Sequence, residues 1–160
     1  MSTWILANNF VYSKNNNTSI NFESRNFNII SQKVNPSISF LKNQFSTIST
    51  TYTYRNEKNT IGTESLKSNN FGLNYNYNNP EKATILASVN LIENNYNGSN
   101  NTPASYKILE GLEAGTNYTW LLTLQKKLTK LLNLSINYNG RKNTSSNAVH
   151  IGSVQLRANF

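Results

Sequence analysis

The amino-acid sequence predicts an all-β fold of antiparallel strands. In many short segments apolar and polar residues alternate with a period of two, the pattern of a strand with one apolar and one polar face. Polar, turn-forming stretches separate these segments. The composition agrees, since 37% of the residues are hydrophobic and 14% are charged, while roughly one in five is Asn. Half of each strand can be polar without entering a protein core, so we expect a single β domain over residues 1–160.

The alternation predicts a series of strands along the chain. The sharpest pattern is Phe71–Tyr77, and the least readable segment is 26–36, where Pro36 should lie at a strand start or in a loop. The Leu-rich and Lys-rich run 121–134 could form a helix, but its period of two on both sides of the Lys pair favours two strands. The expected strands are 4–12, 20–25, 38–40, 48–55, 71–77, 85–91, 118–125, 132–139 and 149–160.

The connections between these strands alternate between long and short. Counted back from the C-terminus, 140–147, 93–115 and 56–69 are long, whereas 126–130, 78–82 and 41–45 are short. Transmembrane barrels have short turns at one end, longer loops at the other and strands with an apolar outer face. Two aromatic girdles are also expected, one near the long loops (Tyr52, Tyr54, Tyr118, Trp120, Tyr138) and one near the short turns (Tyr75, Tyr77).

These features together predict an antiparallel up-and-down transmembrane β-barrel of about eight strands, or the C-terminal eight or nine strands of a larger barrel. The alternative is a soluble, basic β-sandwich or β-barrel binding module, which shares the period of two. Such a module would hide its aromatic residues inside and would show no regular asymmetry of loop length.

The last strand carries a recognisable pattern. Gly152, Val154, Leu156 and the terminal Phe160 resemble the C-terminal strand of outer-membrane barrel proteins, which the barrel-assembly machinery reads as a signal; the small Ala158 and the distance of the Gly from the end depart from it. The segments 106–115, 125–130, 137–142 and 150–160, with Trp120, are similar to the C-terminal end of large, poorly characterised outer-membrane proteins of Bacteroidota. The resemblance implies a bacterial outer-membrane location and three kinds of partner: the lipid bilayer, the assembly machinery, and other barrel strands or outer-membrane proteins. It implies no activity.

The number of strands stays open. Nine strands put the two ends of the chain on opposite sides of the membrane, whereas bacterial single-chain barrels have an even number. Either one strand around 26–36 has been counted as two, which gives a closed eight-stranded barrel, or the chain is the C-terminal piece of a larger one. The length favours the first solution. The resemblance, and the absence of a signal peptide at Met1–Ala7, favour the second.

The sequence offers little for catalysis. His150 is the only His, and Cys and Asp are absent, so a transition-metal site or a Ser-His-Asp triad cannot be assembled from this chain. His150 is in phase with the apolar residues of the last predicted strand and lies near its outer end, so we expect an interfacial residue. Glu110 and Glu113 are expected to be solvated loop acids rather than a Ca²⁺ site. We therefore expect a non-catalytic protein without a cofactor.

The charges give one further expectation. The formal net charge is +8, but the Lys and Arg residues are scattered rather than clustered, which argues against nucleic-acid binding. Four charged residues share the polar parity of their predicted strands and are expected to form a charge network in the barrel lumen: Glu23, Arg25, Arg141 and Arg157.

Overall fold

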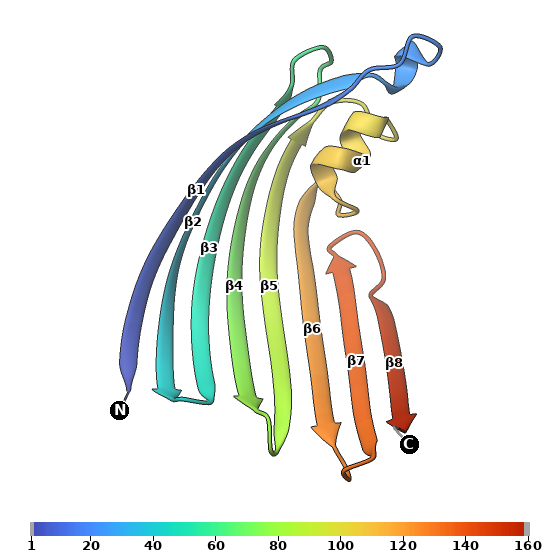
Figure 1. Cartoon of the computed structure of the whole chain (residues 1–160). Helices are drawn as coiled ribbons and strands as arrows, with labels where there is room; N and C mark the ends of the chain where they lie inside the picture. Colours follow the sequence, from blue (N-terminus) through green and yellow to red (C-terminus); the bar gives the residue numbers. More distant parts are fainter. Residues whose placement is uncertain (1, 159–160) are drawn as a thin grey trace.

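The computed structural model describes residues 2–158 and contains one antiparallel sheet in which the strands follow each other in chain order (Figure 1). The two helical elements both lie in connections between strands: the 3-10 turn η1 (Glu23–Arg25) and the helix α1 (Pro103–Leu109). The strands are β1 (Thr3–Asn17), β2 (Phe27–Asn43), β3 (Ser46–Asn59), β4 (Ser65–Asn79), β5 (Ala83–Asn97), β6 (Gly115–Lys127), β7 (Leu132–Asn143) and β8 (Val149–Ala158).

The all-β, up-and-down prediction is confirmed, but the sheet is not closed into a barrel. Each strand pairs with the next one along the chain, from Thr3 opposite Leu41 in the first pair to Arg141 opposite Val149 in the last. Figure 1 shows β1 and β8 at opposite sides of the curved sheet. Within residues 2–158, β1 and β8 therefore each have one edge without a ladder partner.

The prediction of a strand at residues 20–25 is wrong. This segment belongs to the β1–β2 connection, where the Asn26 side chain accepts a hydrogen bond from the Ser19 N–H (2.7 Å) and donates one to the Ser19 carbonyl (3.1 Å). The segment 26–36, which was hard to read, lies almost entirely in β2. The expectation that Pro36 lies at a strand start or in a loop is wrong, because Pro36 lies inside β2. It is tolerated there because the β2–β3 ladder is interrupted between Val34 and Ser37.

The described sheet accordingly has eight strands, and β1 begins at the same end of the sheet at which β8 ends. The alternation of connections is confirmed: 44–45, 80–82 and 128–131 are short, whereas 18–26, 60–64, 98–114 and 144–148 are longer. The long loop predicted at 56–69 is wrong, because β3 and β4 stay paired as far as Lys58 and Ser65. Polar residues on both faces of the strands hid this extension.

The two faces of the sheet differ sharply. One face carries an apolar band, a set of mostly apolar side chains that recurs on all eight strands. On β7 and β8 it includes the pair Ile136–Val154, and on β1 to β6 it includes the row Leu6–Ile38–Thr50–Leu73–Val89–Trp120. These side chains are uncovered: Leu6 is 77% exposed, and Val154 is 72% exposed. The opposite face is mostly Asn, Ser and Thr, and is called the polar face below.

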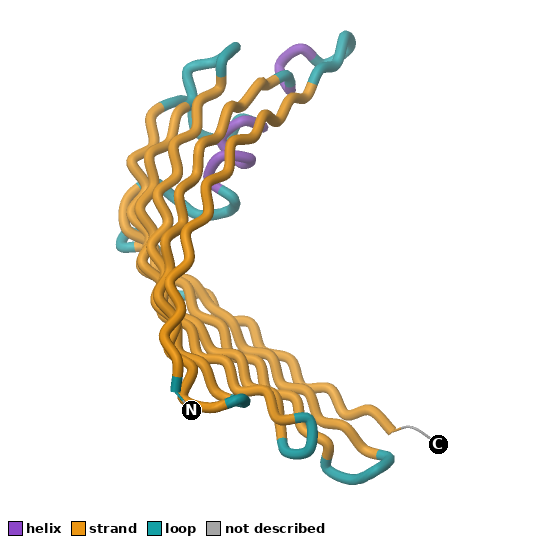
Figure 2. Tube along the Cα trace, turned by 60° about the vertical axis from the view of Figure 1, so that its left-hand side comes forward, coloured by secondary structure: helices purple, strands orange, loops and turns teal. Residues whose placement is uncertain are grey.

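The small hydrophobic core lies on the polar face, toward the long-loop end. Ile29 of β2 and Leu66 of β4 pack there against Ile108 of α1, and all three are buried. Figure 2 shows the sheet as a curved layer with α1 inside the curve. Among the described residues, neither helical segment has the length and apolar character needed to cross a membrane.

Candidate functional site

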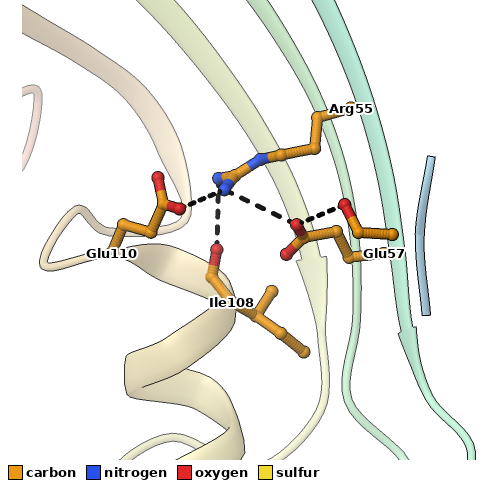
Figure 3. A network of polar contacts seen from close by, with 5 residues as sticks. Arg55, Glu57, Ile108 and Glu110 are labelled. Atoms are coloured by element: carbon orange, nitrogen blue, oxygen red, sulfur yellow. Dashed lines mark hydrogen bonds and ion pairs between the residues drawn. The ribbon is translucent and has the colours of Figure 1, made fainter. Parts of the chain in front are cut away.

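The candidate site is the part of the polar face that α1 covers, and Arg55 is its central residue (Figure 3). Arg55 Nη2 donates to the carbonyl of Ile108 (3.1 Å), and Nη1 lies 3.0 Å from Glu110 Oε1 and 3.7 Å from Glu57 Oε1. Glu57 Oε1 also accepts a hydrogen bond from Ser31 Oγ (2.8 Å). The last carbonyls of a helix lack partners within the helix and interact favourably with cations. Arg55 therefore anchors the C-terminal end of α1 to β3.

The N-terminal end of α1 is anchored by Glu64, from the β3–β4 connection. Thr102 is the N-cap residue and forms a capping box with Ser105, followed by Pro103 at the first helical position. The Thr102 hydroxyl donates to Glu64 Oε1 (2.9 Å), and Asn59 Nδ2 donates to Glu64 Oε2 (2.8 Å). Glu64 is 6% exposed.

The protonation of Glu64 is coupled to this anchor. Burial disfavours the charged carboxylate, but hydrogen bonds from the Asn59 side chain, from the Glu64 and Thr63 backbone and from the Thr102 hydroxyl outweigh that cost and hold the pKa of Glu64 below its usual value. The contacts of Glu64 between β3 and α1 thus stabilise its ionised form.

The chain on both sides of α1 is shaped to bring the helix onto the sheet. Gly98 (φ 142°) and Gly111 (φ 79°) have backbone conformations that favour Gly, and a Cβ at Gly98 would lie 2.7 Å from Glu64 Cα. Arg141 Nη1 of β7 donates to the carbonyl of Gly111 (2.6 Å). The helix and its flanking turns are therefore fixed from β3, from the β3–β4 connection and from β7.

A row of buried Asn residues fixes the segment after α1. Asn117 Nδ2 donates to the carbonyls of Glu113 (2.8 Å) and Gly115 (3.0 Å), and its Oδ1 accepts from the Glu113 N–H (3.1 Å). Asn94 Nδ2 also donates to the Glu113 carbonyl (3.1 Å), and Asn143 Nδ2 reaches Asn117 Oδ1 (3.3 Å). Some of the many Asn side chains thus form the hydrogen bonds that the backbone N–H and C=O groups of this irregular loop cannot form with other backbone groups.

The anchored helix borders a pocket of about 330 Å³ that is lined by residues of β1 to β5. Hydroxyl and amide side chains line much of it, including Ser13, Ser31 and Asn70. Its charged lining residues are Lys33, Arg55, Glu57, Lys107 and Glu110.

The predicted lumen charge network is not brought together. Glu23 and Arg25 lie in η1 rather than on a strand, and the Arg25 guanidinium stacks on the Phe22 ring, 4.8 Å from its centroid. Arg141 and Arg157 do lie on the polar face, but 16 residues apart on different strands, with Arg141 beside the α1 segment and Arg157 near the short turns. The sequence pattern does not predict the network that does form, around Arg55, because the polar stretch after Arg55 predicts a loop that includes Glu57. Its signal was available, since Arg55 and Glu57 are two apart and share a face of β3.

All of the predicted interfacial aromatics lie on the face with the apolar band. The set is Tyr52, Tyr54, Tyr75, Tyr77, Tyr118, Trp120 and Tyr138. Tyr52 packs on Phe71 (4.9 Å between ring centroids), and its hydroxyl donates to Asn69 Oδ1 (2.7 Å). Because β3 continues to Asn59, Tyr52 and Tyr54 lie within the strand, toward the edge of the apolar band rather than at the strand end.

The remaining predicted residues fall on β8 and the α1 segment. His150 lies on the face with the apolar band, where its Nδ1 is 2.8 Å from the Tyr138 hydroxyl and its ring is 5.4 Å from that of Trp120. Gly152, Val154 and Leu156 lie on the same exposed face of β8, whereas Phe160 is outside the described residues.

Glu110 and Glu113 do not converge on a metal site. Glu110 pairs with Arg55, whereas Glu113 Oε2 lies 3.4 Å from Ser145 Oγ. Within residues 2–158 no three acidic, His or Cys side chains are grouped as metal ligands would be. Comparisons with protein-family models, with curated proteins and with solved structures found no match.

Proposed function

We propose that this chain forms the wall, or part of the wall, of an integral β-barrel of the bacterial outer membrane, with a structural, porin-like or surface-binding role rather than a catalytic one. The observation that carries the proposal is the apolar band, which recurs on all eight strands and is exposed. Soluble monomers rarely expose contiguous apolar patches larger than a few hundred Å². Lipid is the partner that such a band fits.

The height of the band supports a membrane partner. On β3 it runs from Ile48 to Tyr54, and on β1 it runs from Trp4 to Tyr12. At about 3.3 Å per residue these stretches are roughly 20 and 26 Å long along the strand. With the strand tilt of about 40° in outer-membrane barrels they span roughly 15 and 20 Å of the ~25 Å apolar band of such barrels. Beyond the band, toward the long loops, the same face turns polar at Asn56 and Lys58. A band limited in this way matches a bilayer better than it matches a protein core.

The two sheet edges indicate that the barrel is completed by further strands. An unpaired backbone group costs several kcal/mol in hydrocarbon, so open edges do not occur in lipid. β1 and β8 run in opposite directions, and the start of β1 lies at the same end of the sheet as the end of β8. A barrel that is antiparallel throughout therefore needs an even number of additional strands between β8 and β1. Those strands come from a partner outer-membrane protein or from another part of a larger barrel.

The second candidate is a soluble, basic β module that binds its ligand on the polar face, which the pocket beside α1 favours. The two proposals differ in what covers the apolar band. We expect the full chain to aggregate in plain buffer and to become monodisperse in a mild uncharged detergent, as measured by size-exclusion chromatography with light scattering. A chain that is monodisperse in plain buffer and binds no detergent contradicts the membrane proposal and favours the soluble module.

A further inference from the structure

The charges on the polar face are mostly of one sign. Among the described strand residues, the register places five cations on this face and Glu57 as the acid. These cations are Lys33, Arg55, Lys127, Arg141 and Arg157. The middle of the face is neutral, with Asn, Ser and Thr side chains between the charged ends.

The cations at the short-turn end gather around a pocket of about 450 Å³. Lys127 and Arg157 lie in one row of the sheet, on either side of Asn133, and Lys82 and Lys126 complete the charged lining. No acidic side chain of the described residues lines this pocket, and its other polar groups are amides and hydroxyls such as Gln125, Ser135 and Gln155.

The cations at the helix end are only partly neutralised. Arg55 pairs with Glu57 and Glu110, the two salt bridges found among the described residues. Lys33 and Lys107 line the same pocket as Arg55 without a carboxylate in salt-bridge range. Counted over residues 2–158, the charged side chains that line the pockets at the two ends of the polar face therefore include more cations than acids.

We infer that the polar face selects small free anions, such as carboxylates and phosphates, over cations of the same size. A hollow lined by charges of one sign and bounded by low-dielectric walls concentrates counter-ions. On β7, Arg141 lies eight residues from Asn133 in the Lys127–Asn133–Arg157 row, or about 26 Å. At low salt, where the Debye length is about 30 Å, the cations at both ends therefore act on the neutral middle of the face. The inference deepens the porin-like role and rests on it, because it names the class of solute that this face would carry.

The absence of Cys permits a direct measurement of the potential at this face. Ser135→Cys places a single thiol in the pocket at the short-turn end, two residues from the Lys127–Asn133–Arg157 row. Its reaction rates with a negatively and a positively charged methanethiosulfonate are compared in uncharged detergent at low salt. We expect the ratio of anionic to cationic rates to be at least about threefold higher than for a free thiol, and to fall toward the free-thiol ratio at high salt.

Two sets of substitutions in the Ser135→Cys chain test whether the cations of the polar face cause that ratio of reaction rates. Lys127→Gln with Arg157→Gln should remove most of the preference, whereas Lys14→Gln with Lys58→Gln, an equal loss of charge on the opposite face of β1 and β3, should leave it unchanged. Inorganic phosphate should slow the anionic reagent. Slowing by micellar phosphatidylglycerol but not by phosphate assigns the face to lipid headgroups and overturns the inference.

A ratio that does not depend on Lys127 and Arg157, or one that favours the cationic reagent, also overturns it. These results leave the membrane proposal standing if the chain still depends on detergent. Conversely, if the chain prefers the anionic reagent but needs no detergent, the inference of an anion-binding face stands and the porin-like role is contradicted.

Discussion

Arg55→Met is the substitution that should release α1 from the sheet. The variant loses a charged hydrogen bond to the Ile108 carbonyl, worth about 1.5–3 kcal/mol, and leaves Glu57, whose side chain is 10% exposed, without its cation. A largely buried carboxylate that keeps its hydrogen bond from Ser31 but has lost its cation adds a cost of about 1–3 kcal/mol. Since Met retains part of the packing of the Arg stem, we expect the free energy of local opening of α1 to fall by about 2–4 kcal/mol.

Amide hydrogen exchange measures this opening directly. The amides of Tyr106 and Glu110 donate to the carbonyls of Thr102 and Tyr106, so they are protected only while the helix is formed. A loss of 2–4 kcal/mol corresponds to exchange that is about 30- to 1,000-fold faster. Amides in the β6–β7 ladder should be unaffected. Adding Glu57→Gln to Arg55→Met should recover part of the protection, because it removes the unpaired charge.

Arg55→Lys keeps the charge but replaces the two terminal guanidinium nitrogens, one on the Ile108 carbonyl and one on Glu110, with a single ammonium nitrogen. Its exchange rates should therefore fall between those of the parent and Arg55→Met. Exchange at Tyr106 and Glu110 that stays within about threefold of the parent in Arg55→Met, a change of under 1 kcal/mol, refutes the role of Arg55 as the anchor of α1.

Three other predictions follow from the same structure. The pKa of Glu64 is lowered relative to 4.5, so its hydrogen bonds stabilise the fold above about pH 4.5, and this stabilisation is lost as the pH falls below that value. Hydrogen exchange at the Tyr106 amide, corrected for its intrinsic pH dependence, should therefore accelerate on acidification of the parent. An equal acceleration in Glu64→Gln would exclude this carboxylate as the cause. Ile108→Ala removes a fully buried side chain from the small core and should weaken the docking of α1 by about 2–5 kcal/mol; unchanged exchange at Glu110 contradicts that core. Gly140→Val puts a Cβ directly against the Trp120 ring and should shift the Trp fluorescence, measured in a Trp4→Phe background. Gly152→Val, whose Cβ has no neighbour within 4 Å, should not. Equal spectra in the two variants would show that Trp120 does not lie over Gly140.

The arrangement of the two faces could be predicted from the sequence because the side-chain period of a strand is two. The apolar parity from Ile48 to Tyr54, and again from Phe71 to Tyr77, matches the apolar band. The strand ends were not predictable in the same way. Past Tyr54 both faces of β3 are polar, so the alternation disappears while the backbone ladder continues to Lys58.

The short helix on the polar face was missed although its capping residues were present in the sequence. Thr102 and Pro103 are typical of a helix start, and Gly111 follows its end. Seven residues are too few to show a helical period, and most of the stability of a helix this short comes from tertiary contacts, here Ile108 on Leu66 and the Arg55 anchor. What covers the outer edges of β1 and β8 was not predictable either, since strand parity carries no information on what lies beyond an edge.

Quenching of Trp fluorescence by brominated phospholipids tests most directly whether the apolar band contacts lipid. Trp4 and Trp120 both lie on the face with the band, and Trp4 is 68% exposed. In vesicles with bromine on the acyl chains, we predict strong quenching of both, measured singly with Trp120→Phe and Trp4→Phe. A Trp placed on the polar face, as Asn137→Trp in a chain without the two native Trp residues, should be quenched far less. Equal quenching on both faces, or none at Trp4 and Trp120, contradicts the assignment of the apolar band to the bilayer.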